Sequence, residues 1–130
     1  MKGIAVYMLD NESKQKLLEV FPPRWKLVGH HVTYKFGASD KDPLPPAGKY
    51  QVVGYNYIAE KRPNGSGLEA LVVAIDGNTT REDGSVYHIT WSHGPAFRPK
   101  DSNDLLKRSG WTTLEEPIDI NLEPAFIPFQ

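Results

Sequence analysis

Two short segments of the sequence share a pattern of residue types that can transfer protons. Segment 30–37 reads HHVTYKFG and segment 87–94 reads YHITWSHG, so each contains a histidine, one aliphatic residue and a threonine. A histidine with its ordinary pKa of about 6.5 can accept or donate a proton near neutral pH, and a threonine hydroxyl can bind an anionic oxygen. Two of the four histidines in the chain, His31 and His88, occur in this pattern.

Both patterns occur in segments rich in β-branched and aromatic residues, which predicts strands. Because side chains alternate across a strand, His31 and Thr33 share one face at about 6–7 Å, and so do His88 and Thr90. Each pair is suited to one half of a phosphate site. Two such halves that face each other place one imidazole on each side of a phosphorus atom. One imidazole can then remove a proton from the attacking oxygen while the other protonates the leaving oxygen, with no metal required.

Strand alternation and side-chain size predict three further substrate contacts. Lys35 and Ser92 extend the two polar strand faces, so we predict that both contact the substrate. Tyr7 falls in the strand-like run GIAVYML, on the same face as Gly3 and Ala5. These small residues would leave room for a ligand, which makes Tyr7 a candidate platform for stacking a nucleobase.

The other two histidines are not assigned to this site. His30 is predicted on the opposite strand face from His31, in a structural role, and His93 does not share a strand face with His88. The chain has no cysteine and no H-E-x-x-H spacing, so we expect no metal site and no other cofactor. The absence of cysteine also excludes disulfides and a cysteine nucleophile.

The composition of the 130 residues is typical of one folded domain, which we assign to residues 1–130. The formal net charge is −1, so the chain lacks the overall positive field that binds long nucleic acids. Any nucleotide ligand is therefore expected to be short and held in a pocket. The first apolar run is too short for a signal peptide or a membrane span, which predicts a cytoplasmic protein without membrane contact.

Hydrophobic periodicity and turn residues predict the order β-α-β-β-β-β-α-β. Asn11 is the expected N-cap of the first helix, Asp101 or Ser102 that of the second, and Gly110 its C-terminal stop. An Asn-Gly turn at 64–65 is expected between the third and fourth strands. The order predicts an α+β domain of mainly antiparallel sheet with outer helices. The expected strands are 3–10, 26–37, 50–61, 68–76 and 86–93, and the expected helices are 11–21 and 100–110. Segment 117–129 is expected to form a last strand followed by a proline-punctuated tail.

Paired His-x-Thr motifs on two pseudo-symmetric lobes are the signature of the 2H phosphoesterase superfamily, which this chain resembles in its motifs and its element order. The resemblance covers nearly the whole chain, but its specific part is the two motifs. It implies two pseudo-symmetric lobes around a central cleft. It also implies that His31 and His88 form the acid–base pair and that Thr33 and Thr90 hold the phosphate. Which histidine is the acid stays open, as does the oligomeric state.

The short format of the chain is most similar to the phage anti-CBASS branch of this superfamily. That likeness implies metal-independent hydrolysis of cyclic di- or trinucleotides, in the host cytoplasm if the protein is phage-encoded. Two different enzymatic functions stay open, an RNA-repair 2′,3′-cyclic phosphodiesterase and a 2′–5′ oligoadenylate phosphodiesterase. The non-enzymatic possibilities are a cyclic-nucleotide sponge on the same fold and an α+β interaction domain with ordinary histidines. The paired histidines favour an enzyme over a sponge, because a sponge needs no proton transfer.

Overall fold

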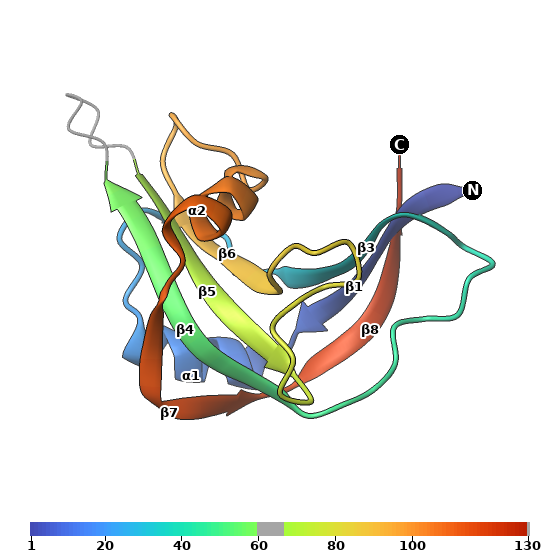
Figure 1. Ribbon diagram of the computed structural model, residues 1–130, viewed down its shortest axis with the longest axis horizontal. Coiled ribbons are helices and arrows are strands. Elements are labelled where there is room, and N and C mark those ends of the chain that lie inside the picture. The colour runs from blue at the N-terminus through green and yellow to red at the C-terminus, as the bar shows by residue number, and fades with distance from the viewer. Residues whose placement is uncertain (60–66, 130) are drawn as a thin grey trace.

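The structure is a computed structural model that describes residues 1–59 and 67–129. Within these ranges, eight antiparallel strands form one open sheet with two helices, so the predicted α+β class is confirmed (Figure 1). The elements are β1 (Lys2–Leu9), α1 (Asn11–Val20), β2 (Lys26–Leu27), β3 (His31–Ser39), β4 (Tyr50–Ala59), β5 (Gly67–Ile75), β6 (His88–His93), α2 (Asp101–Ser109), β7 (Thr112–Ile120) and β8 (Leu122–Pro128). The predicted turn at 64–65 lies outside the described residues. No helix in the described ranges is long and apolar enough to cross a membrane.

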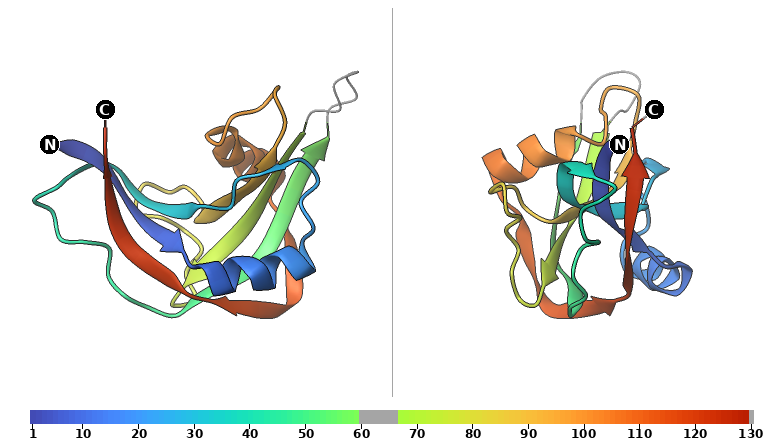
Figure 2. Two further views of the ribbon diagram at one scale, coloured as in Figure 1. Left: turned by 180° about the vertical axis from the view of Figure 1, so that it is seen from behind. Right: turned by 90° about the vertical axis from the view of Figure 1, so that its right-hand side faces the viewer.

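The sheet has two halves that meet between β3 and β6. Its strand order is β7-β4-β5-β6-β3-β1-β8, with β2 paired to β6. One residue pair, Val32 with Ile89, joins β3 to β6, whereas β1 and β3 pair along most of their length. The predicted last strand is in fact two strands, β7 and β8, separated at Asn121. Figure 2 shows them as one bent band along the outside of the curved sheet, where they pair with β4 and β1 respectively.

The larger core lies between one face of the sheet and α1. Leu17 of α1 and Trp91 of β6 belong to this core, and both are fully buried. The helix begins after Asp10, whose carboxylate accepts a hydrogen bond of 2.8 Å from the backbone N–H of Ser13. Asp10 is therefore the N-cap in place of the predicted Asn11, which is the first residue inside the helix.

The helix α2 covers the opposite face of the sheet. Its Leu106 packs against Ala70 and Val72 of β5 in a second, smaller core. Gly110 follows the helix with a φ of 64°, a conformation that glycine adopts easily, so the predicted stop is confirmed. Neither Asp101 nor Ser102 is the N-cap as predicted, because the N-cap position is Lys100, which forms no side-chain capping bond. Ser102 is buried, and its hydroxyl lies 2.9 Å from that of Thr90, so it ties α2 to β6.

Candidate active site

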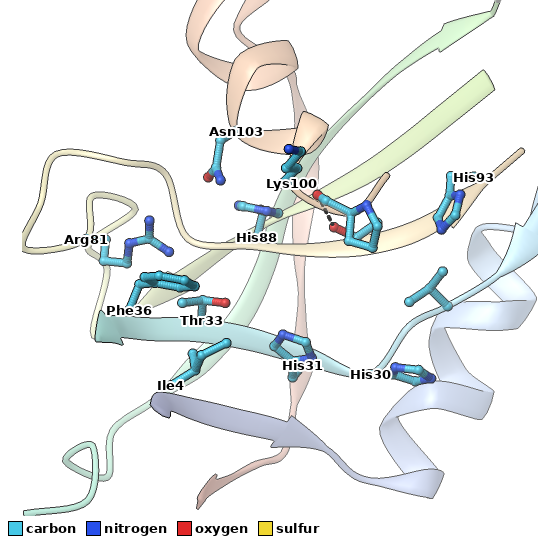
Figure 3. Close-up of a pocket in the computed structure, with 13 residues that line it drawn as sticks. Ile4, His30, His31, Thr33, Phe36, Arg81, His88, His93, Lys100 and Asn103 are labelled. Atoms are coloured by element: carbon cyan, nitrogen blue, oxygen red, sulfur yellow. Dashed lines mark hydrogen bonds between the residues drawn. The ribbon is translucent and has the colours of Figure 1, made fainter. Parts of the chain in front are cut away.

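A cleft of about 720 Å³ opens on the α2 side of the sheet, where β3 and β6 meet. All four histidines of the chain line this cavity, which we call the histidine cleft: His30, His31, His88 and His93. Figure 3 shows one wall formed by β1 and β3 and the other by β6 and α2. The cleft therefore lies between the two halves of the sheet.

The two His-x-Thr motifs face this cleft from adjacent strands. The aliphatic residue of each motif is fully buried in the α1 core, and these two residues form the pair that joins β3 to β6. His31 and Thr33 flank Val32, and His88 and Thr90 flank Ile89, so the polar residues of both motifs lie next to this one pair and line the cleft. The predicted alternation of the two motifs is confirmed.

The His88 imidazole is buried and held in one orientation. Its Nδ1 lies 2.8 Å from the Val86 carbonyl oxygen, which can only accept, so Nδ1 carries a proton and donates it. Burial lowers the pKa of His88 below 6.5. The Val86 contact opposes this shift, and the nearby charges of Arg81 and His31 lower the pKa further. Near pH 7 the ring is therefore neutral, with a lone pair on Nε2.

His31 and Thr33 present polar groups that the protein itself does not use. His31 is half-buried, and burial lowers its pKa, as does the neighbouring charge of His30. Within residues 1–59 and 67–129, neither the His31 ring nor the Thr33 hydroxyl has a hydrogen-bond partner. Both groups remain available to a ligand.

The lowered histidine pKa values predict that acid destabilises the protein. Since the folded-state pKa values of His31 and His88 lie below 6.5, the unfolded chain takes up protons first, and the free energy of unfolding falls as the pH drops through 6.5. Each histidine contributes a slope of at most about 1.4 kcal/mol per pH unit. Urea unfolding at pH 7.5, 6.5 and 5.5 measures this slope. The variant His88→Asn keeps a donor to the Val86 carbonyl and should reduce the slope; equal slopes in both proteins would contradict the prediction.

Thr90 lines the cleft, but its hydroxyl is already bonded within the protein. It donates to the Pro99 carbonyl oxygen at 3.1 Å, the dashed line in Figure 3. Because its one hydrogen is used there, the 2.9 Å contact with Ser102 has Ser102 as the donor. The role of Thr90 in holding the phosphate stays a prediction, because its hydroxyl lines the cleft but is already hydrogen-bonded within the protein.

Lys35 is exposed and does not line the histidine cleft. The pairing of β1 with β3 shifts by one residue between Thr33 and Lys35, which leaves Tyr34 as an extra residue in a β-bulge. A shift of one residue reverses the strand face of every residue beyond it. Phe36 therefore lines the cleft in the place predicted for Lys35.

Ser92 is fully buried and also does not line the cleft. Its hydroxyl donates to the Glu69 carboxylate at 2.8 Å. The pairing of β5 with β6 shifts by one residue between Thr90 and Ser92, which makes Trp91 the extra residue. His93 lines the cleft in place of Ser92, so strand alternation failed beyond Thr90 as well.

Tyr7 is a core residue and not a stacking platform. It is fully buried in the core that contains α1, its ring packs on Tyr50, and its hydroxyl donates to the Pro46 carbonyl at 2.7 Å. Burial raises the pKa of its phenol. A Cβ at Gly3 would collide with Phe126 and the backbone of β8. Gly3 therefore makes room for β8 and not for a ligand.

Besides His30 and His93, which the sequence analysis did not assign to this site, three other unassigned polar residues line the cleft: Arg81, Lys100 and Asn103. Arg81 lies in the turn-rich segment 77–85, and the other two lie at the start of α2. Among the described residues, the cleft is lined by basic side chains and by no carboxylate. In the sequence, the only feature that could have indicated these cleft residues is the presence of a basic residue, Arg81 or Lys100, in each of the two polar segments. Basic residues in polar segments are common at protein surfaces, so this feature is not specific.

The histidines of the cleft do not converge on a single point. In the described part of the chain, no three His, Cys, Asp or Glu side chains are grouped so that they could hold a metal ion.

Comparisons with protein families, curated proteins and solved structures found no match to this chain.

Proposed function

We propose that the histidine cleft is the active site of a metal-independent phosphodiesterase, with His31 and His88 as its acid–base pair. The observation that carries the proposal is the meeting of the two His-x-Thr motifs on adjacent strands at one cleft. The cleft between two sheet halves also agrees with the lobed arrangement that the 2H phosphoesterase resemblance implies. We propose this fold relationship as well.

In the proposed reaction His88 is the base. Its neutral Nε2 takes a proton from the attacking water, which forms a bond to phosphorus as the bond to the leaving oxygen breaks. His31 gives its proton to that leaving oxygen. The bound phosphate supplies the negative charge that raises the pKa of His31 and keeps it protonated. Thr33 donates its hydroxyl hydrogen to a non-bridging oxygen.

The proposed substrates are small cyclic oligonucleotides, with cyclic di- and trinucleotides as the first class to test. A volume of about 720 Å³ is typical of small-molecule sites, and the basic lining suits an anion. Phe36 is 68% exposed at the cleft and can stack a base, the role predicted for Tyr7. Such signals occur in the cytoplasm, where we propose that the protein acts.

A nucleotide-binding sponge is the second candidate. It is favoured by the lowered pKa values of both His31 and His88, because the unliganded protein then holds no protonated acid near pH 7. A sponge and an enzyme bind the same ligands and differ only in turnover.

The experiment is an activity screen with EDTA present, read by chromatography. The panel contains cyclic dinucleotides, cyclic trinucleotides, 2′–5′ oligoadenylate and 2′,3′-cyclic mononucleotides. We expect cleavage of a cyclic oligonucleotide. Turnover restricted to 2′,3′-cyclic ends or to 2′–5′ linkages would instead indicate an RNA-repair enzyme or an oligoadenylate phosphodiesterase. Saturable binding without cleavage would indicate the sponge, and neither binding nor cleavage would overturn the proposal.

A further inference from the structure

Arg81 is a buried cation held rigidly at the edge of the histidine cleft. Its side chain is 8% exposed, and its Nε and Nη2 donate to the Asp83 carboxylate at 3.0 and 2.9 Å. Backbone bonds within the same turn, to Ser85 and from Gly84, fix its position. Within the described residues, the remaining guanidinium nitrogen, Nη1, has no hydrogen-bond partner. This nitrogen is therefore available to a ligand in the cleft.

The positive charge of Arg81 acts on the cleft. Burial is the main cause of the lowered pKa of His88, and the charge of Arg81 adds to it. Asp83 is the carboxylate partner of Arg81, but its side chain is 54% exposed, so solvent screens it more than it screens the buried guanidinium. From the other elements packed around His88, the facing groups are His31 on β3 and Lys100 and Asn103 at the start of α2 (Figure 3). This end of the cleft therefore favours an anion.

A phosphate between the two motifs lacks one of its expected donors. A phosphodiester has two non-bridging oxygens, and both motif threonines were expected to bind them. Thr33 has a free hydroxyl, but Thr90 has donated its hydrogen to the Pro99 carbonyl. Ser92 of β6 does not replace it, because its hydroxyl is bonded to Glu69. The second non-bridging oxygen therefore needs a donor from outside the motifs.

We propose that Arg81 is this donor and binds a non-bridging oxygen of the phosphate that lies between His31 and His88. The inference rests on the proposed function and adds Arg81 to it as a catalytic residue. A guanidinium forms charge-assisted hydrogen bonds to phosphate oxygens, which are stronger than those of a hydroxyl. It also stabilises the negative charge that builds up on these oxygens during the reaction. The site therefore selects a phosphate group and not a neutral ligand.

The experiment measures binding of inorganic phosphate, followed by NMR of the histidine ring protons. Three variants are compared with the wild type: Arg81→Gln, Arg81→Met and Arg108→Gln. Arg108 is an exposed arginine of α2 that does not line the cleft, so it is the matched control. We expect the phosphate dissociation constant to rise at least tenfold in both Arg81 variants and to stay unchanged in the control. Without phosphate, loss of the Arg81 charge should raise the pKa of His88 towards its ordinary value.

If Arg81→Gln unfolds the protein because a polar side chain is buried without a partner, Arg81→Met still tests the inference, because methionine is apolar and similar in length. Wild-type phosphate affinity in a folded Arg81 variant would overturn the inference, as would the absence of phosphate binding by the wild-type protein. Either result would leave the proposed phosphodiesterase standing if the nucleotide screen showed turnover. Phosphate binding that depends on Arg81, combined with no turnover of any nucleotide, would support the anion site and overturn the proposed enzyme.

Discussion

Replacing either His31 or His88 is expected to lower turnover at least about a hundredfold and to leave the protein folded, because in the proposed reaction each transfers one of the two protons. The sharpest variants are His88→Asn, which keeps a donor to the Val86 carbonyl, and His31→Gln, which keeps a polar side chain in the cleft. The measurement is kcat on the nucleotide that the screen identifies, with circular dichroism as the check on folding.

His93→Asn is the matched control for these variants. It also removes a histidine from the cleft, but not one of the two proposed proton carriers, so we expect a loss of less than about fivefold. A full rate in either folded His31 or His88 variant would exclude the paired acid–base mechanism. An equal loss of kcat in all three variants would show that turnover does not depend specifically on the two proposed proton carriers.

Trp91→Ala is expected to reduce the free energy of unfolding by about 3–5 kcal/mol, the range typical of removing a buried tryptophan. Trp91 is fully buried, and its Nε1 donates to the Phe21 carbonyl at 2.9 Å, which ties β6 to the end of α1. Gly29 lies so close to the ring that an added Cβ would be 2.9 Å from Trp91 Cζ3. The alanine would therefore leave a cavity and an unpaired carbonyl directly beneath the strand that carries His88.

Urea unfolding measures this loss. The variant Trp91→Phe keeps most of the ring volume and loses the hydrogen bond, so we expect a smaller cost of about 1–2 kcal/mol. A cost below about 1 kcal/mol for Trp91→Ala would show that the core between α1 and the sheet collapses onto the vacated space, contrary to the packing described above.

Strand alternation in the two motifs was predictable because it is a local property of the backbone. Val32 and Ile89 are buried while their neighbours face the cleft, as the polar and apolar pattern indicates. Gly110 ends α2 for an equally local reason, its left-handed backbone conformation. The same alternation failed for Lys35 and Ser92, because each lies one residue beyond a bulge.

The bulges depend on neighbouring strands and not on the segments that contain them. Tyr34 and Trp91 are the extra residues; Trp91 lies in the core that contains α1, and Tyr34 is partly buried and packs against this core. Burial of these rings offsets the loss of regular strand pairing at each bulge. The one-residue shift at each bulge then makes Phe36 and His93 face the cleft. The sequence alone does not show which aromatic side chain will pack between the sheet and α1.

The sequence by itself determined the α+β class, the strands that carry the two motifs, and the shared face of each histidine and threonine, because these follow from backbone geometry and hydrophobic pattern. Only the tertiary structure decided that the two motifs meet across β3 and β6, since strand pairing joins residues 57 positions apart. It also decided that Thr90 bonds to Pro99 while Arg81 reaches the same cleft. Hydrogen-bond partners and charges of this kind come from loops and helices whose positions depend on the packing of the whole chain.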